Sequence, residues 1–329
     1  MTRPTPKRIP LNAAFDALVL GAVWGLTFLV IKWGLRDAGP VTLGALRVLV
    51  GAVGLVTLAR LLAGPVPRSG RAHLEIAAVG MIQVGVFGAL LNLGTARTNV
   101  GVTSLIIYSQ PAIVAVLAVR WLGERLRPSQ AVGVAVGVVG LALVVLGQQG
   151  IETGAPWVGY ALLIGAATSW AAGAVLFRRL RPALPFLWAV ALQTAYAGVA
   201  LCGAAVVSEG PDVRFTGRLV LVTLFLGFGA SGLAYLLWFR LLVGPSAVAA
   251  STSLLFVPLW AAVFGVVLRG ERWTMPAVSG GICILGGVWL VYRGTGMAAA
   301  NDPGGGRPDV APRWGGDDDP GPCRSDGRP

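Results

Sequence analysis

Two stretches of the sequence share one pattern: PAIVAVLAVRWLGER at residues 111–125 and PLWAAVFGVVLRGER at residues 258–272. In each stretch a proline stands thirteen residues before the glutamate of a Gly-Glu-Arg triplet, and the residues between them are almost all apolar. A glycine-rich apolar run follows each triplet, with Gly133, Gly137 and Gly140 in the first case and Gly280, Gly281, Gly286 and Gly287 in the second. The same features in the same order at the same spacing indicate an internal repeat.

The repeat extends toward the N-terminus of each half. Trp24 and Trp170 lie in apolar runs that are rich in small residues, and each is followed eight residues later by a basic residue, Lys32 or Arg178. The offset between the halves is 147 residues for the proline and 146 for the tryptophan. Chance similarity between Gly- and Val-rich segments is the alternative, and the agreement of the two offsets argues against it.

Ten apolar runs account for most of the chain. Hydrophobic residues make up 55% of the sequence and charged residues 12%, whereas soluble domains carry about 25% charged residues. A helix that spans a bilayer needs about 20 mostly apolar residues, and no run alternates with the period of two that strands require. The runs lie at 13–34, 41–60, 75–96, 98–119, 129–149, 155–177, 184–207, 218–239, 244–268 and 274–292.

Because each repeat holds an odd number of spans, the second half must enter the membrane from the opposite side. The sequence therefore predicts an all-α integral membrane protein with ten transmembrane helices in two inverted five-helix repeats, an arrangement typical of secondary transporters. We place an N-terminal segment at 1–12, the first repeat at 13–150 and the second at 151–293. The remainder, 294–329, is rich in Gly, Pro, Asp and Arg and is expected to be a disordered tail.

The distribution of basic residues predicts the orientation. With the N-terminus in the cytoplasm, fourteen Lys and Arg residues fall on the inner side of the runs and seven on the outer side, leaving out Arg47 and the distal tail. The positive-inside rule therefore places both termini in the cytoplasm. The chain has 24 Arg and only two Lys, which favours a bacterial genome rich in G and C, and hence a multi-pass protein of the cell inner membrane.

Taken together, the ten runs, the two halves and the proline followed by Gly-Glu at the fourth run of each half resemble the drug/metabolite transporter superfamily, in particular its EamA family. The resemblance covers roughly residues 13–293 and is carried by the whole pattern. It implies export or exchange of a small organic solute at a central cavity lined by the first, third, fourth, sixth, eighth and ninth helices.

Candidate substrate-binding residues are the polar and aromatic groups near mid-depth of those helices. They are Trp24, Thr27, Gln83, Asn92, Tyr108, Gln110, Trp170, Tyr235 and Ser253. Packing is the alternative role for the two tryptophans, and bonding between helices is the alternative for Gln83 and Asn92. Trp238 lies near the end of its run and is expected to anchor the helix at the membrane interface.

Three further residues are candidates for helix breaks or gating. Pro111 and Pro258 each remove a backbone donor, which opens a helix where it faces a cavity or merely kinks it. Arg47 lies inside the second run, where its long side chain either reaches toward the surface or serves as a charged gate that attracts an anion.

Other classes of function find little support. No Gly-x-x-x-x-Gly-Lys-Ser/Thr motif for ATP is present, and no Asp or Glu stands near the middle of a run, which favours facilitated diffusion or exchange over simple proton coupling. The sequence has a single His, no catalytic constellation and no metal-ligand spacing, so we expect neither an enzyme nor a cofactor.

The expected partners are a small-molecule substrate and the lipid bilayer, with no nucleic acid; a homodimer is left open. A membrane-embedded enzyme and a non-transporting scaffold are the alternatives to transport.

Overall fold

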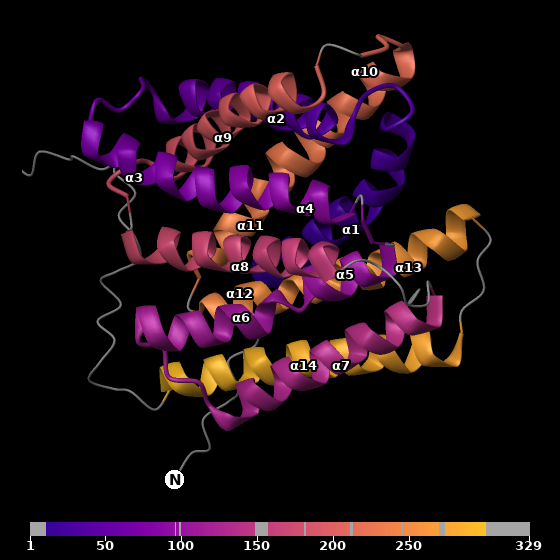
Figure 1. Ribbon diagram of the computed structural model, residues 1–329. Coiled ribbons are helices and arrows are strands. Elements are labelled where there is room, and N and C mark those ends of the chain that lie inside the picture. Colours follow the sequence, from indigo (N-terminus) through magenta and orange to yellow (C-terminus); the bar gives the residue numbers. More distant parts are fainter. Residues whose placement is uncertain are drawn as a thin grey trace, which may run out of the picture.

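The computed structural model describes residues 11–95, 97–98, 100–148, 157–180, 182–210, 213–244, 246–269 and 274–300. These residues form helices joined by short turns, with no strand among them, and ten helical segments are long and apolar enough to cross a membrane (Figure 1). The ten segments are Ala13–Ile31, Pro40–Ala63, Gly70–Thr95, Thr103–Leu122, Pro128–Gly147, Trp157–Leu180, Phe186–Ser208, Gly217–Leu242, Ala247–Leu268 and Met275–Gly294. The predicted all-α membrane fold is confirmed.

Several spanning helices are divided into shorter elements. In the first half the elements are α1 (Leu11–Gly34), α2 (Pro40–Ala63), α3 (Gly70–Gly80), η1 (Met81–Val86), α4 (Phe87–Thr95), α5 (Val100–Tyr108), α6 (Gln110–Leu117), η2 (Ala118–Leu122) and α7 (Pro128–Gln148). In the second half they are α8 (Trp157–Leu180), α9 (Phe186–Ser208), α10 (Gly217–Leu224), η3 (Phe225–Leu233), α11 (Ala234–Leu242), α12 (Ala247–Thr252), η4 (Ser253–Leu255), α13 (Phe256–Arg269) and α14 (Met275–Ala300). Helix α14 thus continues past the boundary of 293 that the sequence suggested.

The spanning helices begin and end at two opposite faces of the bundle. We call the end where α1 begins and α14 ends the terminal face, and the opposite end the far face. In Figure 1 the terminal face is on the left, where α3 begins, and α10 begins at the upper right on the far face. Five spans after α1, helix α8 begins at the far face, so the second half runs through the bundle in the inverted sense.

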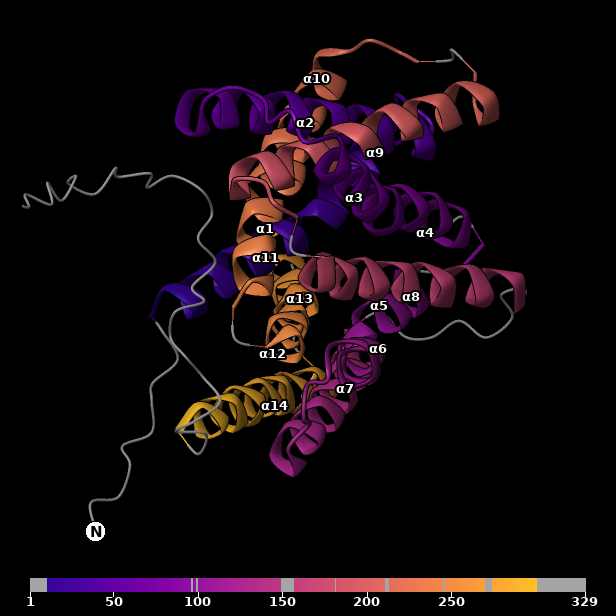
Figure 2. The ribbon, with the colours of Figure 1, turned by 90° about the vertical axis from the view of Figure 1, so that its left-hand side faces the viewer.

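Equivalent helices of the two halves pack against each other at the two edges of the bundle. Helices α2 and α9, the second of each half, form one pair, and α7 and α14, the fifth of each half, form the other. Viewed from the terminal face, the first pair lies at the top of the molecule and the second at the bottom (Figure 2). The other spanning helices lie between these two pairs.

Helices α7 and α14 approach each other through reciprocal glycine contacts. A Cβ atom placed on Gly133 would lie 2.7 Å from the carbonyl oxygen of Gly287, and one on Gly287 would lie 2.5 Å from that of Gly133. Gly140 and Gly280 repeat this relation at 2.6 and 2.5 Å. Residue numbers rise along one helix as they fall along the other, so the repeat-equivalent helices are antiparallel, as two inverted halves require.

Irregular turns also occur in equivalent places. The third spanning helix contains the wide π-helical turn η1, and the eighth contains the π-helical turn η3. The fourth spanning helix is interrupted between Tyr108 and Gln110, immediately before Pro111, and the ninth narrows to the 3₁₀ turn η4 shortly before Pro258. Both predicted helix breaks therefore lie beside their prolines.

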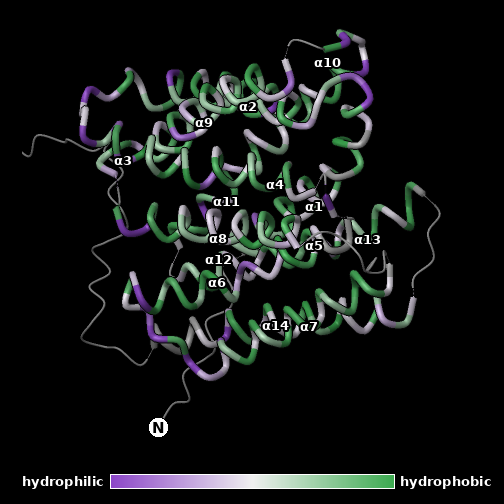
Figure 3. Tube along the Cα trace, in the orientation of Figure 1, coloured by the Kyte–Doolittle hydropathy of each residue, from purple (hydrophilic) through white to green (hydrophobic). Residues whose placement is uncertain are grey.

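The outer surface of the bundle suits a bilayer. Large apolar side chains stand exposed on many helices, among them Val53 on α2, Val199 on α9 and Ile282 on α14. Figure 3 shows hydrophobic residues along most of the spanning helices and hydrophilic ones where α3 begins and where α6 leads into α7. Exposed apolar surface on this scale would be a liability in water, whereas hydrocarbon is its natural solvent.

The glycine contacts lead to a stability prediction. In Gly287→Ala the added methyl group would meet the backbone of α7, and overpacking of this kind costs roughly 1–3 kcal/mol. Gly286→Ala is the matched control, because nothing lies within 4 Å of a Cβ at that position. We expect Gly287→Ala to lower the thermal unfolding midpoint of the purified protein in detergent, with Gly286→Ala unchanged or slightly stabilised. Equal midpoints for the two variants would contradict this packing.

Candidate functional site

A cavity of about 80 Å³ lies near the middle of the bundle, between the two halves. Side chains from the first, second, third, fourth, sixth and eighth spanning helices line it. We call it the central cavity. Its lining consists of Trp24, Thr27, Ile31, Arg47, Phe87, Leu91, Thr103, Ser104, Ile107, Tyr108, Gln110, Trp170 and Tyr235. The second helix takes part through Arg47, whereas the ninth, which the resemblance implied, contributes none of these residues.

Most of the candidate residues chosen from the sequence meet here. Seven of them line the central cavity: Trp24, Thr27, Arg47, Tyr108, Gln110, Trp170 and Tyr235. The side chain of Asn92 lies outside the described residues. Gln83 and Ser253 are described and do not line the cavity.

Four aromatic rings form one wall of the central cavity. The ring of Trp170 lies 4.8 Å from that of Phe87, 5.5 Å from that of Trp24 and 6.2 Å from that of Tyr235, measured between centroids. Trp24 and Tyr235 meet edge to face at 6.1 Å. Aromatic pairs at such separations and angles attract each other beyond simple burial. The two tryptophans that mark the sequence repeat are thus in direct contact at the centre of the molecule.

Trp238 contradicts its expected role as an interfacial anchor. Its side chain is fully buried, and its ring lies 5.6 Å from that of Trp170. The position near the end of an apolar run suggested an anchor, but the indole ring packs inside the bundle against Trp170 of α8. Trp238 therefore supports the aromatic wall from behind.

Two side chains hold the π-helical turns beside the cavity. Trp24 donates from Nε1 to the carbonyl oxygen of Ala230 in η3, at 2.9 Å. Ser169, next to Trp170, donates from Oγ to the carbonyl oxygen of Ile82 in η1, at 2.6 Å. A π-helical turn interrupts the regular pattern of backbone hydrogen bonds in an α-helix. In each half, the first spanning helix donates a side-chain hydrogen bond to the third spanning helix of the other half.

Gln83 and Ser253 lie elsewhere for local reasons. Gln83, in η1, is fully buried against Gly173 of α8, and neither polar atom of its side chain has a hydrogen-bond partner among the described residues. Ser253 begins the 3₁₀ turn η4, which directs its hydroxyl toward α14, where it bonds to the hydroxyl of Tyr292 at 2.8 Å. The expected cavity positions of both residues are not observed.

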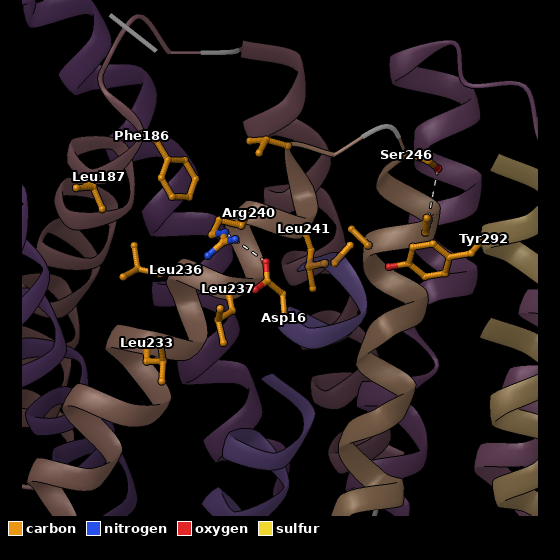
Figure 4. A pocket seen from close by; sticks show the side chains of 14 residues that line it. Asp16, Phe186, Leu187, Leu233, Leu236, Leu237, Arg240, Leu241, Ser246 and Tyr292 are labelled. Carbon is orange, nitrogen blue, oxygen red and sulfur yellow. Dashed lines mark hydrogen bonds and ion pairs between the residues drawn. The ribbon is translucent and has the colours of Figure 1, made fainter. Parts of the chain in front are cut away.

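A second, larger hollow opens at the terminal face. This pocket of about 700 Å³ is lined by residues of α1, α9, α11, α12 and α14 and is mostly apolar. The buried carboxylate of Asp16 lies within it and forms an ion pair with Arg240 at 3.3 Å (Figure 4). Arg240 remains half exposed. We call this hollow the terminal pocket.

At the far face the turn between α1 and α2 meets the start of α10 through a tighter pair. Arg218 donates to both carboxylate oxygens of Asp37, at 2.7 and 2.8 Å, and the hydroxyl of Thr216 donates to the same carboxylate at 2.9 Å. Only 2% of the Asp37 side chain is exposed. The Arg218 guanidinium lowers the pKa of Asp37 below its ordinary value, with a further contribution in the same direction from Thr216.

The first Gly-Glu-Arg triplet has a structural role. Glu124 accepts hydrogen bonds from the Ser246 hydroxyl and the Ala247 backbone N–H, at 3.0 and 3.1 Å, and so caps the start of α12. It also pairs with Arg178 at 3.5 Å. Arg178 in turn donates to the carbonyl oxygens of Leu242 and Gly244 at the end of α11. The second triplet, 270–272, lies outside the described residues.

The family of the chain follows from its sequence. A model of the EamA-like transporter family matches residues 12–146 and again residues 157–293, one match for each half of the fold. The chain belongs to the EamA-like transporter family.

Several relatives of this EamA-like chain are named as transporters, efflux pumps or exporters. An uncharacterized transporter, YvbV, of Bacillus subtilis is 25% identical over 87% of this chain and 93% of its own length. A probable amino-acid metabolite efflux pump of Salmonella typhimurium is 27% identical over 84% of this chain and 93% of its own. A probable terminal-alkyne amino-acid exporter of Streptantibioticus cattleyicolor is 29% identical over 87% and 95%. Family and relatives identify the chain as a membrane transporter of small metabolites.

A solved crystal structure shares the fold of the EamA-like chain. It superimposes with a TM-score of 0.73 at 18% sequence identity and covers 85% of this chain and 96% of its own. At that identity the likeness concerns the fold alone.

Six cavity residues were not selected from the sequence. Phe87 and three aliphatic residues are apolar, and an apolar residue in a spanning helix carries no signal of its own. Thr103 and Ser104 could have been found, because Ser104 stands one helical turn before Tyr108 and therefore shares its face.

The far-face ion pair leads to a pH prediction. Because folding lowers the pKa of Asp37, the stabilisation is complete above the ordinary carboxyl pKa and is lost as the pH falls through the lowered value. We expect Asp37→Asn to lower the thermal unfolding midpoint at pH 7. The loss of midpoint between pH 7 and pH 3 should be smaller for Asp37→Asn than for the intact protein. Parallel pH profiles for the two proteins would show that this pair does not contribute.

Proposed function

We propose that the chain is a secondary transporter that exports small organic metabolites across the bacterial inner membrane by alternating access at the central cavity. One observation carries this proposal: the cavity lies where two inverted halves meet, and both repeat-marking tryptophans face it. Inverted-repeat transporters bind their solutes at such an interface. The function of the family and of the named relatives supports the same class.

Alternating access requires a change of shape, and the geometry supports one. A volume of about 80 Å³ is well below the roughly 300–1,000 Å³ of ordinary ligand pockets, so the central cavity must widen to admit a solute. Ion pairs tie α1 and the turn that follows it to the eighth spanning helix: Asp16 of α1 pairs with Arg240 at the terminal face, and Asp37 of the turn between α1 and α2 pairs with Arg218 at the far face. Separation of these helices at one face would break one pair and leave the other closed.

The direction and orientation of transport are also part of the proposal. Three features support export from the cytoplasm: the positive-inside bias, the terminal pocket on the face that would then be cytoplasmic, and relatives named as efflux pumps and exporters. One of those relatives is named for amino-acid metabolites and the other for terminal-alkyne amino acids, and we propose metabolites of comparable size as the substrates of this chain.

Comparative export is the decisive test of transport. The intact chain, Trp24→Ala and Trp33→Ala would be expressed in one bacterial host at equal membrane abundance, and small molecules in the medium would be measured by mass spectrometry. Trp33 lies on the same helix and is 55% exposed, so it controls for loss of a tryptophan. We expect a set of metabolites to rise with the intact chain and with Trp33→Ala, and to fall about tenfold with Trp24→Ala, equivalent to about 1.4 kcal/mol. No enrichment with the intact chain would refute export.

The orientation has its own test. In a variant whose three cysteines are replaced by serine, a single cysteine at Glu152 should react with a membrane-impermeant thiol reagent in intact cells. A single cysteine at Arg68 should react only after the cells are opened. The reverse pattern would place the termini outside the cytoplasm while leaving the fold unchanged.

A further inference from the structure

Arg47 is the charged side chain of the central cavity. It stands on α2 seven residues beyond Pro40, and no other charged residue appears among the described side chains that line the cavity. None of the four ion pairs found among the described residues includes Arg47. Its guanidinium contacts the hydroxyl of Tyr235 and lies near Tyr108, and both of these groups are uncharged partners. The side chain therefore faces the cavity.

A cation in this position is costly unless an anion balances it. Charged groups inside a membrane protein are usually paired with each other or with a ligand. One guanidinium balances one negative charge, and its planar fork matches the two oxygens of a carboxylate. The charge of the cavity thus points to a monoanionic group on the solute.

Gln110 provides a second, independent sign of a ligand. Its side chain lines the same cavity and is only 3% exposed, and its Oε1 atom has no hydrogen-bond partner among the described residues. A buried acceptor without a partner costs about 1–3 kcal/mol. A solute with an N–H or ammonium group would supply the missing donor.

The aromatic wall is the third feature of the central cavity that bears on the solute. The faces of Trp24, Phe87, Trp170 and Tyr235 attract apolar groups and also cations that lie above the rings. The cavity therefore combines a fixed cation, a free acceptor and an apolar wall.

We infer that Arg47 selects solutes by binding a carboxylate, and that Gln110 accepts a hydrogen bond from an amino group of the same solute. This inference rests on the proposed transport function and assigns its specificity to two residues. The ligand class is a small zwitterion with an apolar body that packs against the aromatic wall.

Export profiles of matched variants test the role of Arg47. The intact chain, Arg47→Gln, Arg47→Lys and Arg60→Gln would be compared in one host at equal membrane abundance. Arg60 lies on the same helix, away from the cavity, with its guanidinium 6.0 Å from the ring centroid of Trp188. We expect the solutes exported by the intact chain to carry a carboxylate and an amino group. Their export should fall at least about tenfold in Arg47→Gln, fall less in Arg47→Lys, which keeps the charge but loses the fork, and persist in Arg60→Gln.

The outcomes separate the two proposals. Export of solutes without a carboxylate, or equal carboxylate export by Arg47→Gln and the intact chain, would overturn the role of Arg47 while leaving transport established. Export of nothing by the intact chain would overturn the proposed function, and the inference with it.

A binding measurement on the intact chain avoids dependence on a single variant. Thermal unfolding of the purified protein would be followed with L-alanine, L-leucine and L-phenylalanine, and with the amide and the deaminated acid of each. We expect at least one amino acid to raise the midpoint more than its amide, which lacks the carboxylate. Gln110→Leu should abolish the preference for that amino acid over its deaminated acid. Equal effects of acids and amides, or no effect of any amino acid, would contradict the inference.

Discussion

The fold depends on the close approach of α7 and α14 through their glycines. In a bilayer there is no hydrophobic force between helices, so association relies on packing, and packing is tightest where the absence of side chains lets backbones meet. Gly133 and Gly140 meet Gly287 and Gly280 reciprocally. This contact joins the last helix of one half to the last helix of the other, and α2 and α9 join the halves at the opposite edge. The central cavity forms between these two joints.

Irregular backbone near the cavity is stabilised across the same division. A backbone group left without a partner inside a membrane costs several kcal/mol, and π-helical turns create such groups. Trp24 and Ser169 each donate to a carbonyl in the third helix of the opposite half. The bond from Trp24 also fixes its ring against Trp170. The position of the aromatic wall and the stability of the irregular turns are therefore set by the same interactions, which makes the shape of the cavity sensitive to any shift of one half relative to the other.

The sequence predicted the fold better than the site, for a physical reason. Spans and repeats follow from hydropathy and spacing, and both survive small errors in helix boundaries. A cavity residue must also face the right way, and inside a π-helical or 3₁₀ turn the side chains depart from the rotation of a regular α-helix. Trp24 and Trp170, which lie in regular helices, were found, whereas Gln83 in η1 and Ser253 in η4 were misplaced. Phe87 was not selected because its side chain is apolar, and it contributes to the cavity through the contact of its ring with Trp170.

The ion pairs that tie Asp16 of α1 and Asp37 of the following turn to the eighth spanning helix do not follow the repeat. An offset of 147 residues carries Asp16 and Asp37 to Leu163 and Leu184, so the acids belong to the first half alone. The far-face pair has three hydrogen bonds to a buried carboxylate, whereas the terminal-face pair is a single 3.3 Å contact beside a pocket of about 700 Å³. The two halves share one fold, yet the contacts between them are stronger at the far face than at the terminal face. With the terminal face in the cytoplasm, as proposed, the weaker closure faces the compartment from which an exporter takes its solute, and the stronger one must be broken only after the solute is bound.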